Sequence, residues 1–259
     1  MVYAIYFLII IFANTIGAIS GVGGGVIIKP LFETFGFHSL ENILFFSCVA
    51  VFTMAIASTF KQVRNGFSID YVRAGAISVG SVIGGTFGNK LVTFLLDYFG
   101  SQTQLQILQI VLTVSSFIIV FFYSLRNAKT LDLTGPIVYL LVGIFLGGFS
   151  TLLGIGGGPI NVSLLIFCFG LKMKEATIYS IITILFSQLA KLVEIATSTG
   201  FGDFDLSVLW VIVPAAILGG YIGGMLSCKF CEKRVGQIFT GVVLLVIFIN
   251  LYNAWQILG

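Results

Sequence analysis

The stretch Gly21-Val22-Gly23-Gly24-Gly25 decides the fold, because it returns 133 positions later as Gly154-Ile155-Gly156-Gly157-Gly158. Both clusters lie within long apolar segments, at 2–36 and 135–170. Glycine is a poor helix-interior residue, since it tolerates positive φ and loses much backbone entropy on folding. A continuous helix of that length would be about 52 Å long, too long for a bilayer core of about 30 Å. We therefore predict that each segment is a helix broken at its glycines.

Further landmarks recur in the same order around the two clusters. Ile83-Gly84-Gly85 matches Ile222-Gly223-Gly224, and the polar stretch 126–132 separates the two sets. The chain is therefore predicted to be a duplication. One membrane repeat occupies 1–126 and a homologous repeat occupies 133–259, together forming one integrated domain.

The composition indicates a membrane protein. Of the 259 residues, 58% are hydrophobic and only 9% are charged, whereas about a quarter are charged in a soluble domain. The lipid bilayer must therefore be the solvent for most of the surface. We predict an all-α polytopic membrane protein in which three transmembrane helices follow each broken segment, at 42–60, 69–96 and 102–125 and again at 174–198, 205–229 and 233–257.

The basic residues predict how the two repeats are oriented. Cytoplasmic loops of membrane proteins carry an excess of Lys and Arg. If each broken segment crossed the membrane once, six basic residues would face seven across it. If each segment turns back instead, ten share one side and only Lys29, Lys90 and Lys191 do not. We therefore predict re-entrant broken segments, an inverted repeat, and both termini outside the cytoplasmic (inner) membrane.

The two glycine clusters also predict a binding site. A half-helix that begins near Val26 or Pro159 aims unpaired N–H groups and a positive dipole end into the membrane interior, which suits an anion. Close helix packing is the alternative explanation, and we favour it only for the two Ile-Gly-Gly sites. The candidate substrate-binding residues are Ser20, Gly21, Gly23, Gly24, Gly25, Gly154, Gly156, Gly157, Gly158, Asn161, Ser187, Gln188 and Lys191.

Several polar side chains in these apolar segments have two interpretations. Lys191 could supply a countercharge to an anion, because ionisable groups inside a membrane are expensive, or it could pair with Glu194 and snorkel. Asn161 could offer its amide to a substrate oxygen or bridge two helices. Lys29 and Glu33, four residues apart, predict an ion pair on one helix.

The sequence holds no recognisable catalytic set, so we do not expect an enzyme. It has no Gly-x-Ser-x-Gly, His-Glu-x-x-His or P-loop motif. Cys228 and Cys231 form a lone CxxC without a second pair, and a metal site would need four ligands. We expect no metal, no cofactor and no nucleic-acid partner, and we interpret His38 as a solvated loop residue.

The duplicated glycine motif resembles that of the TauE/SafE family of transporters. The resemblance rests on Gly21–Gly25 followed by Lys29-Pro30, on Leu153–Pro159 and on the two Ile-Gly-Gly sites. It implies export or uptake of sulfite, sulfonates, sulfoacetate and related organosulfur anions, including taurine-related ones.

We therefore predict a secondary transporter for small anions that works by alternating access around a midplane site, with a proton or a sodium ion as the possible coupling ion. A passive anion channel is one alternative, and a non-transporting membrane subunit is another. The sequence leaves open which anion is carried and which oligomer forms.

Overall fold

The computed structural model describes residues 2–67, 69–125, 130–154, 157–198, 200–202 and 204–258. Over these ranges the chain folds into α-helices, one short 3-10 helix and connecting turns, without strands. The elements are α1 (Val2–Ser20), α2 (Gly25–Phe35), α3 (Leu40–Arg64), α4 (Tyr71–Phe99), α5 (Gln102–Leu125), α6 (Pro136–Leu152), α7 (Pro159–Phe169), α8 (Met173–Thr197), η1 (Leu206–Val208), α9 (Leu209–Lys229) and α10 (Glu232–Leu258).

Local chemistry explains where several helices begin and end. The side chain of Ser39 accepts a hydrogen bond from the first turn of α3, and that of Asp70 does the same for α4, as helix N-caps commonly do. The short helices α2 and α7 end at Gly36 and Gly170, which both adopt the left-handed conformation that closes many helices. The helix ends are therefore encoded locally.

The surface of the helix bundle is apolar. Seven helices of the described chain, namely α1, α3, α4, α5, α8, α9 and α10, are long and apolar enough to cross a membrane. Large side chains such as Phe87, Trp210 and Phe248 point outwards from these helices. A soluble protein would not expose so much contiguous apolar surface. The predictions of an all-α fold and of a multi-pass membrane protein are confirmed.

Two long apolar segments are interrupted at the glycine clusters, as the sequence predicts. The first segment consists of α1 and α2, joined by residues 21–24, and the second consists of α6 and α7, joined by residues 153–158. We call these segments the first and the second broken pair. Residues 155 and 156 of the second junction lie outside the described chain, so the structure does not place Gly156 of the predicted site.

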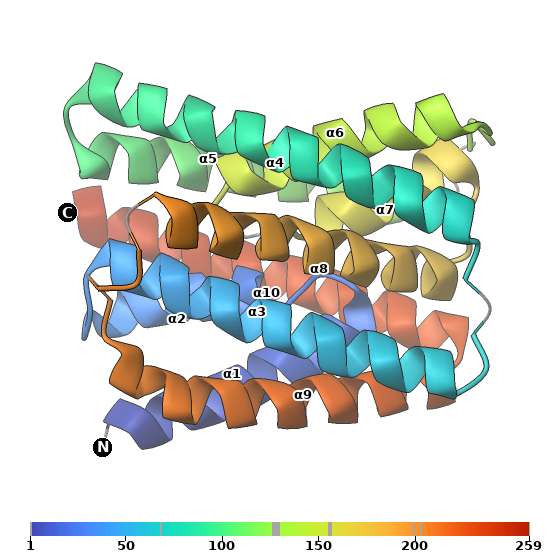
Figure 1. The fold of residues 1–259 in the computed structure, drawn as a ribbon, viewed down its shortest axis with the longest axis horizontal. Coiled ribbons are helices and arrows are strands. Elements are labelled where there is room, and N and C mark those ends of the chain that lie inside the picture. The colour runs from blue at the N-terminus through green and yellow to red at the C-terminus, as the bar shows by residue number, and fades with distance from the viewer. Residues whose placement is uncertain are drawn as a thin grey trace.

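Each broken pair returns to the end of the molecule from which it starts. The ring of Tyr6 near the start of α1 stacks on Phe32 near the end of α2, with ring centroids 3.9 Å apart. The ring of Tyr139 near the start of α6 meets Phe169 at the end of α7, at 5.0 Å. In Figure 1, α1 and α2 share the left end with both termini, whereas α6 and α7 share the right end.

His38, interpreted above as a solvated loop residue, is packed against α1 and α3 instead. Its Nδ1 lies 2.8 Å from the hydroxyl oxygen of Tyr6, and its ring meets Phe46 edge-on at 5.3 Å. The return of α2 beside α1 brings these partners together, which the local sequence did not indicate.

Helices of the two predicted repeats pack against each other at their Ile-Gly-Gly sites. Helix α4 packs along α6 and α9 packs along α1 (Figure 1). A Cβ at Gly84 of α4 would overlap the carbonyl oxygen of Ile144 in α6. A Cβ at Gly223 of α9 would lie 2.6 Å from the carbonyl oxygen of Thr15 in α1. The small residues let these backbones touch, in agreement with the packing interpretation.

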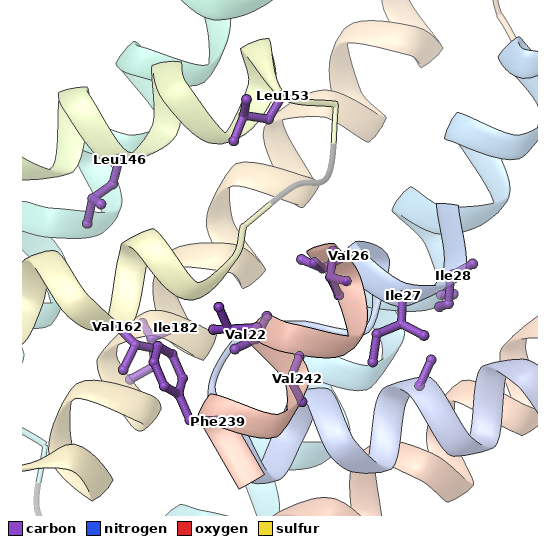
Figure 2. Close-up of a cluster of buried hydrophobic side chains, with 14 of the residues drawn as sticks. Val22, Val26, Ile27, Ile28, Leu146, Leu153, Val162, Ile182, Phe239 and Val242 are labelled. Carbon is purple, nitrogen blue, oxygen red and sulfur yellow. The ribbon is translucent and has the colours of Figure 1, made fainter. Parts of the chain in front are cut away.

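The interior between the two broken pairs is filled mainly by aliphatic and aromatic side chains. Figure 2 shows Val22 from the first junction and Val162 from α7, together with Ile182 of α8 and Phe239 and Val242 of α10. All five are buried. Because this interior is so apolar, each polar side chain within it has to be explained by a specific partner.

Candidate functional site

The two glycine junctions meet at Ile184, near the middle of α8. A Cβ at Gly23 would lie 3.1 Å from the Cδ1 atom of Ile184, and a Cβ at Gly157 would lie 2.6 Å from the same atom. Both glycines have positive φ, 81° and 150°, which side-chain-bearing residues rarely adopt. Glycine is therefore required on two grounds at the point where the first and second broken pairs come together.

Two helices begin next to this meeting point and run to opposite ends of the molecule. Helix α2 starts at Gly25 and α7 starts at Pro159, and their far ends lie beside the starts of α1 and α6 respectively. The first N–H groups of a helix have no partner within it, and they form the positive end of its dipole. Two such ends in the molecule's interior create an environment that favours negative charge.

The first junction is held by a neutral hydroxyl group of α8. Ser180 Oγ donates to the carbonyl oxygen of Gly21 at 2.6 Å. Thr177 Oγ1 donates within α8 to the carbonyl oxygen of Met173 at 2.8 Å, and the carbonyl oxygen of Ser20 lies 3.4 Å from the same hydroxyl. The hydroxyl of Ser20 donates to Ile16 in its own helix at 2.8 Å. Ser20 therefore contributes its backbone to this junction, whereas its side chain is engaged locally.

Asn14 on α1 is a buried polar side chain that the sequence analysis missed. Its Nδ2 donates to the carbonyl oxygen of Ala50 at 3.3 Å, whereas its Oδ1 has no hydrogen-bond partner. That oxygen lies directly against Gly24, so that a Cβ at Gly24 would overlap it. The sequence did contain a signal for this residue, because Asn14 is a polar amide side chain within a charge-free apolar helix.

The second junction is held by a charged group from the first broken pair. Lys29 Nζ donates to Gln109 Oε1 at 2.9 Å and to the carbonyl oxygen of Leu153 at 3.5 Å. Gln109 Nε2 in turn donates to the carbonyl oxygen of Leu152 at 3.0 Å. A cation suits these carbonyls because they form the negative end of α6. We call this arrangement of Lys29, Gln109 and the end of α6 the lysine clamp.

Gly154 and Asn161 take part in the second broken pair in different ways. A Cβ at Gly154 would lie 3.0 Å from Lys29 Nζ, so the absence of a side chain at Gly154 leaves room for the Lys29 ammonium group. Asn161 is buried, and its Oδ1 accepts a hydrogen bond from Ser150 Oγ at 3.1 Å. That hydrogen bond joins α6 to α7. Gly158 is the residue that immediately precedes α7.

Ser187 and Lys191 of α8 line a small polar cleft with Thr151 of α6, and Glu194 lines it as well. The cleft volume is about 10 Å³, roughly enough for one water molecule. The positive charge of Lys191 repels that of Lys29, so the cleft lies close enough to the lysine clamp for their charges to interact. The nearby Gln188 is buried, and its carbonyl oxygen accepts from Cys48 Sγ at 3.7 Å.

The assembled groups favour negative charge. Helix N-termini, two lysine ammonium groups and several hydroxyl groups lie within an apolar interior, where electrostatic interactions are strong. Within the described ranges, no three His, Cys, Asp or Glu side chains group as a metal site would require. The predicted residues on the two junctions and on α8 are therefore brought together, with Lys29, Gln109 and Asn14 as additions.

Comparison with known proteins gives one result. No curated protein and no solved structure matched the chain. A family model described as sulfite exporter TauE/SafE matches residues 6–251, from the second turn of α1 to the later part of α10. On this evidence the chain belongs to the sulfite exporter TauE/SafE family of membrane transporters.

Proposed function

We propose that the protein is a secondary transporter that moves small sulfur-containing anions across the cytoplasmic membrane by alternating access. Sulfite and organosulfonates such as sulfoacetate and taurine-related compounds are the proposed substrates, in keeping with the family. One observation carries the proposal: Gly23 and Gly157 meet at Ile184 while α2 and α7 start beside them and run to opposite ends. The midplane would thus hold two helix N-termini that attract an anion from either side.

The contacts of the broken pairs support a re-entrant, inverted arrangement. Each short helix, α2 or α7, has 11 residues, about 16 Å of helix, whereas a crossing needs about 30 Å. Because each returns to its own starting end, we propose that each pair dips into the membrane and comes back. Three crossing helices then follow in each half, and an odd number of crossings inverts the second half relative to the first.

The charge distribution supports an orientation with the termini outside. Most basic residues of the described chain lie in sequence near the ends of α3 and α9 or the starts of α4, α8 and α10. These helix ends lie at the right of Figure 1, opposite the start of α1 and the end of α10. The contact of Lys174 Nζ with the carbonyl oxygen of Cys228, at 3.2 Å, ties α8 and α9 together at this end. By the positive-inside rule this end is cytoplasmic. Its basic residues are Lys61, Arg64, Arg73, Lys172, Lys174, Lys229, Lys233 and Arg234.

We propose distinct roles for the site residues. Backbone N–H groups of Gly24, Gly25, Gly157 and Gly158 bind the anion's oxygens, whereas the Gly23 N–H donates to the carbonyl oxygen of Gly17 at 3.3 Å. Lys191 and Ser187 approach the anion through the polar cleft. Asn161 offers its Nδ2 group to the anion while its Oδ1 accepts from Ser150 Oγ. A cleft of about 10 Å³ is far too small for a sulfonate, so loading requires the helices to move. That requirement is what alternating access supplies.

The packing at the junctions favours a transporter over a passive channel. Val22 and Ile184 are fully buried between the two glycine junctions, and they separate the two ends of the molecule at this level. A channel needs a continuous watery path when open, whereas a transporter needs only alternate exposure of one site. Saturation and counterflow distinguish the two mechanisms.

The test is uptake by the purified protein in liposomes, with methanesulfonate, sulfoacetate, sulfite and sulfate as probes and protein-free liposomes as the control. The expected result is saturable uptake of at least one sulfur oxyanion and accelerated exchange when the same anion is loaded inside. Currents that do not saturate would assign the channel instead. Absence of uptake for all four probes would contradict anion transport.

A further inference from the structure

A buried carboxylate accompanies the lysine clamp. Glu33 lies one turn beyond Lys29 on α2, with its Oε1 3.9 Å from Lys29 Nζ, and the two side chains are only 11% and 7% exposed. Glu33 Oε1 has no hydrogen-bond partner although it is shielded from solvent. A buried, unsatisfied carboxylate oxygen is costly, so its presence calls for an explanation beyond helix stability.

The ammonium group of Lys29 is shared between several acceptors. It donates to Gln109 Oε1 and to the carbonyl oxygen of Leu153, and Glu33 is its more distant partner at 3.9 Å. Lys29 also lies close to Gly154 at the second junction. An anion that reaches the junctions would therefore meet Lys29, and it would compete with Glu33 for the same positive charge.

Charge balance sets a condition on that competition. In the empty site, Lys29 and Glu33 neutralise each other, while Lys191 and Glu194 line the neighbouring cleft together and add no net charge. A monoanion would leave one negative charge uncompensated in an apolar interior, which is strongly unfavourable. Uptake of one proton by the Glu33 carboxylate restores neutrality.

We infer that Glu33 is the proton-binding site of this transporter, so that one proton crosses with each monoanion. The inference rests on the proposed transport function and adds its coupling ion. The proton comes from water on the side where the anion is loaded and binds a Glu33 carboxylate oxygen. It leaves to water on the opposite side when the anion departs, and Glu33 then becomes the countercharge of Lys29 again.

The surroundings of Glu33 fit this role. Lys29 is the charged group that acts on it, and the Gln106 side chain of α5 lies against its carboxyl group. Gln106 is only half-buried and gives Glu33 a polar neighbour towards the end where α5 begins. The helices packed against α2 are α1, α3 and α10. Their titratable residues are Tyr3, Tyr6, Glu41, Cys48, Lys61, Arg64, Glu232, Lys233, Arg234 and Tyr252, and His38 lies in the turn between α2 and α3.

The test follows proton and anion movement together in liposomes that contain a pH-sensitive dye. Methanesulfonate is the probe, because it stays a monoanion near neutral pH and cannot carry the proton itself. We expect the wild type to take up one proton per methanesulfonate, at a rate that valinomycin with potassium does not change. Glu33→Gln should take up methanesulfonate without protons, and valinomycin should raise its rate several-fold because uptake becomes electrogenic.

Two further variants complete the test. Glu41→Gln makes the same substitution at an exposed position on α3, and it should keep the wild-type proton coupling. Lys29→Gln combined with Glu33→Gln removes both charges, so no unpaired charge remains to prevent folding if the single variant proves unstable. The double variant should lose proton uptake and most methanesulfonate uptake.

The outcomes distinguish proton binding by Glu33 from the proposed anion transport. Methanesulfonate uptake by the wild type without protons, or proton uptake that persists in Glu33→Gln or in the double variant, would overturn the role of Glu33 and leave anion transport standing. Absence of uptake of methanesulfonate, sulfoacetate, sulfite and sulfate by the wild type would contradict the proposed transport, and the inference with it.

Discussion

The first and second broken pairs share a backbone design but differ in what holds their junctions. At the first junction, the carbonyl of Gly21 accepts from the neutral hydroxyl of Ser180. At the second, the carbonyls at the end of α6 accept from Gln109 and from the charged Lys29. The two broken pairs therefore have a similar backbone path, whereas the groups that hold their junctions differ.

This difference gives the two junctions different responses to an anion. The hydroxyl groups at the first junction carry no net charge, so an anion attracts them less strongly than it attracts an ammonium group, and we expect the first junction to change less. The lysine clamp is electrostatic, and an anion competes directly for Lys29. The second junction is therefore the part that an anion can release, and the first serves as its fixed reference.

The largest expected effect comes from breaking the clamp with Lys29→Gln. The change leaves Glu33 as an unpaired buried charge, and losing one member of a buried pair costs about 3–5 kcal/mol. We expect a clearly lower midpoint of thermal unfolding in detergent, together with loss of sulfonate uptake. Lys90→Ala on the exposed face of α4 is the control, and it should leave both unchanged. Wild-type stability in Lys29→Gln would show that the lysine clamp does not stabilise the second junction.

A second, smaller effect should follow from Gly157→Ala. This position combines positive φ with a Cβ that would lie 2.6 Å from Ile184, and a strained backbone of this kind costs about 1–3 kcal/mol. Gly23→Ala, with 3.1 Å to the same side chain, should cost less. Thermal unfolding of both variants measures the difference, and Gly75→Ala, where a Cβ meets open space, is the control. Equal stability of Gly75→Ala and Gly157→Ala would show that glycine is not required at position 157.

Much of the helical fold could be predicted from the sequence, because helix positions follow from apolar runs and glycine. The predicted helix 42–60 is α3 (Leu40–Arg64) in the structure. It was underestimated because Lys61 and Arg64 end the charge-free run, although long basic side chains are tolerated at a helix end. Both breaks were predictable, since glycine acts through its own backbone and needs no knowledge of distant partners.

The lysine clamp could not be predicted in the same way. Lys29 and Glu33 are four residues apart, so helical spacing indicates a local ion pair, which exists at 3.9 Å. The partner Gln109 is 80 residues from Lys29 and the carbonyl of Leu153 is 124 residues away. The contact with Gln109 joins two helices of the first half and the contact with Leu153 joins the two halves, and neither periodicity nor hydropathy reports on such long-range contacts. The same holds for His38 and its contact with Tyr6.

The third prediction concerns the polar cleft next to the clamp. Lys191→Ala removes a positive charge that faces the proposed anion path, and we expect sulfonate uptake to fall about tenfold, which corresponds to about 1.4 kcal/mol. The side chain is only partly buried, so the variant should fold normally, as circular dichroism and size-exclusion chromatography would verify. Uptake at the wild-type rate would remove Lys191 from the site and leave Lys29 as the main countercharge.

The smallest effect is expected at the first junction, from Ser180→Ala. The hydroxyl donates to the carbonyl oxygen of Gly21 at 2.6 Å, and loss of one neutral hydrogen bond costs about 1 kcal/mol. Because this junction serves as the fixed reference, sulfonate uptake should stay near the wild-type rate while the unfolding midpoint falls slightly. Thr183→Ala is a matched control, since its hydroxyl donates within α8 to Tyr179 and not to the junction. Loss of uptake in Ser180→Ala with a normal unfolding midpoint would contradict the division of roles between the two junctions. It would show that transport depends on the first junction, which is held by a neutral hydroxyl group.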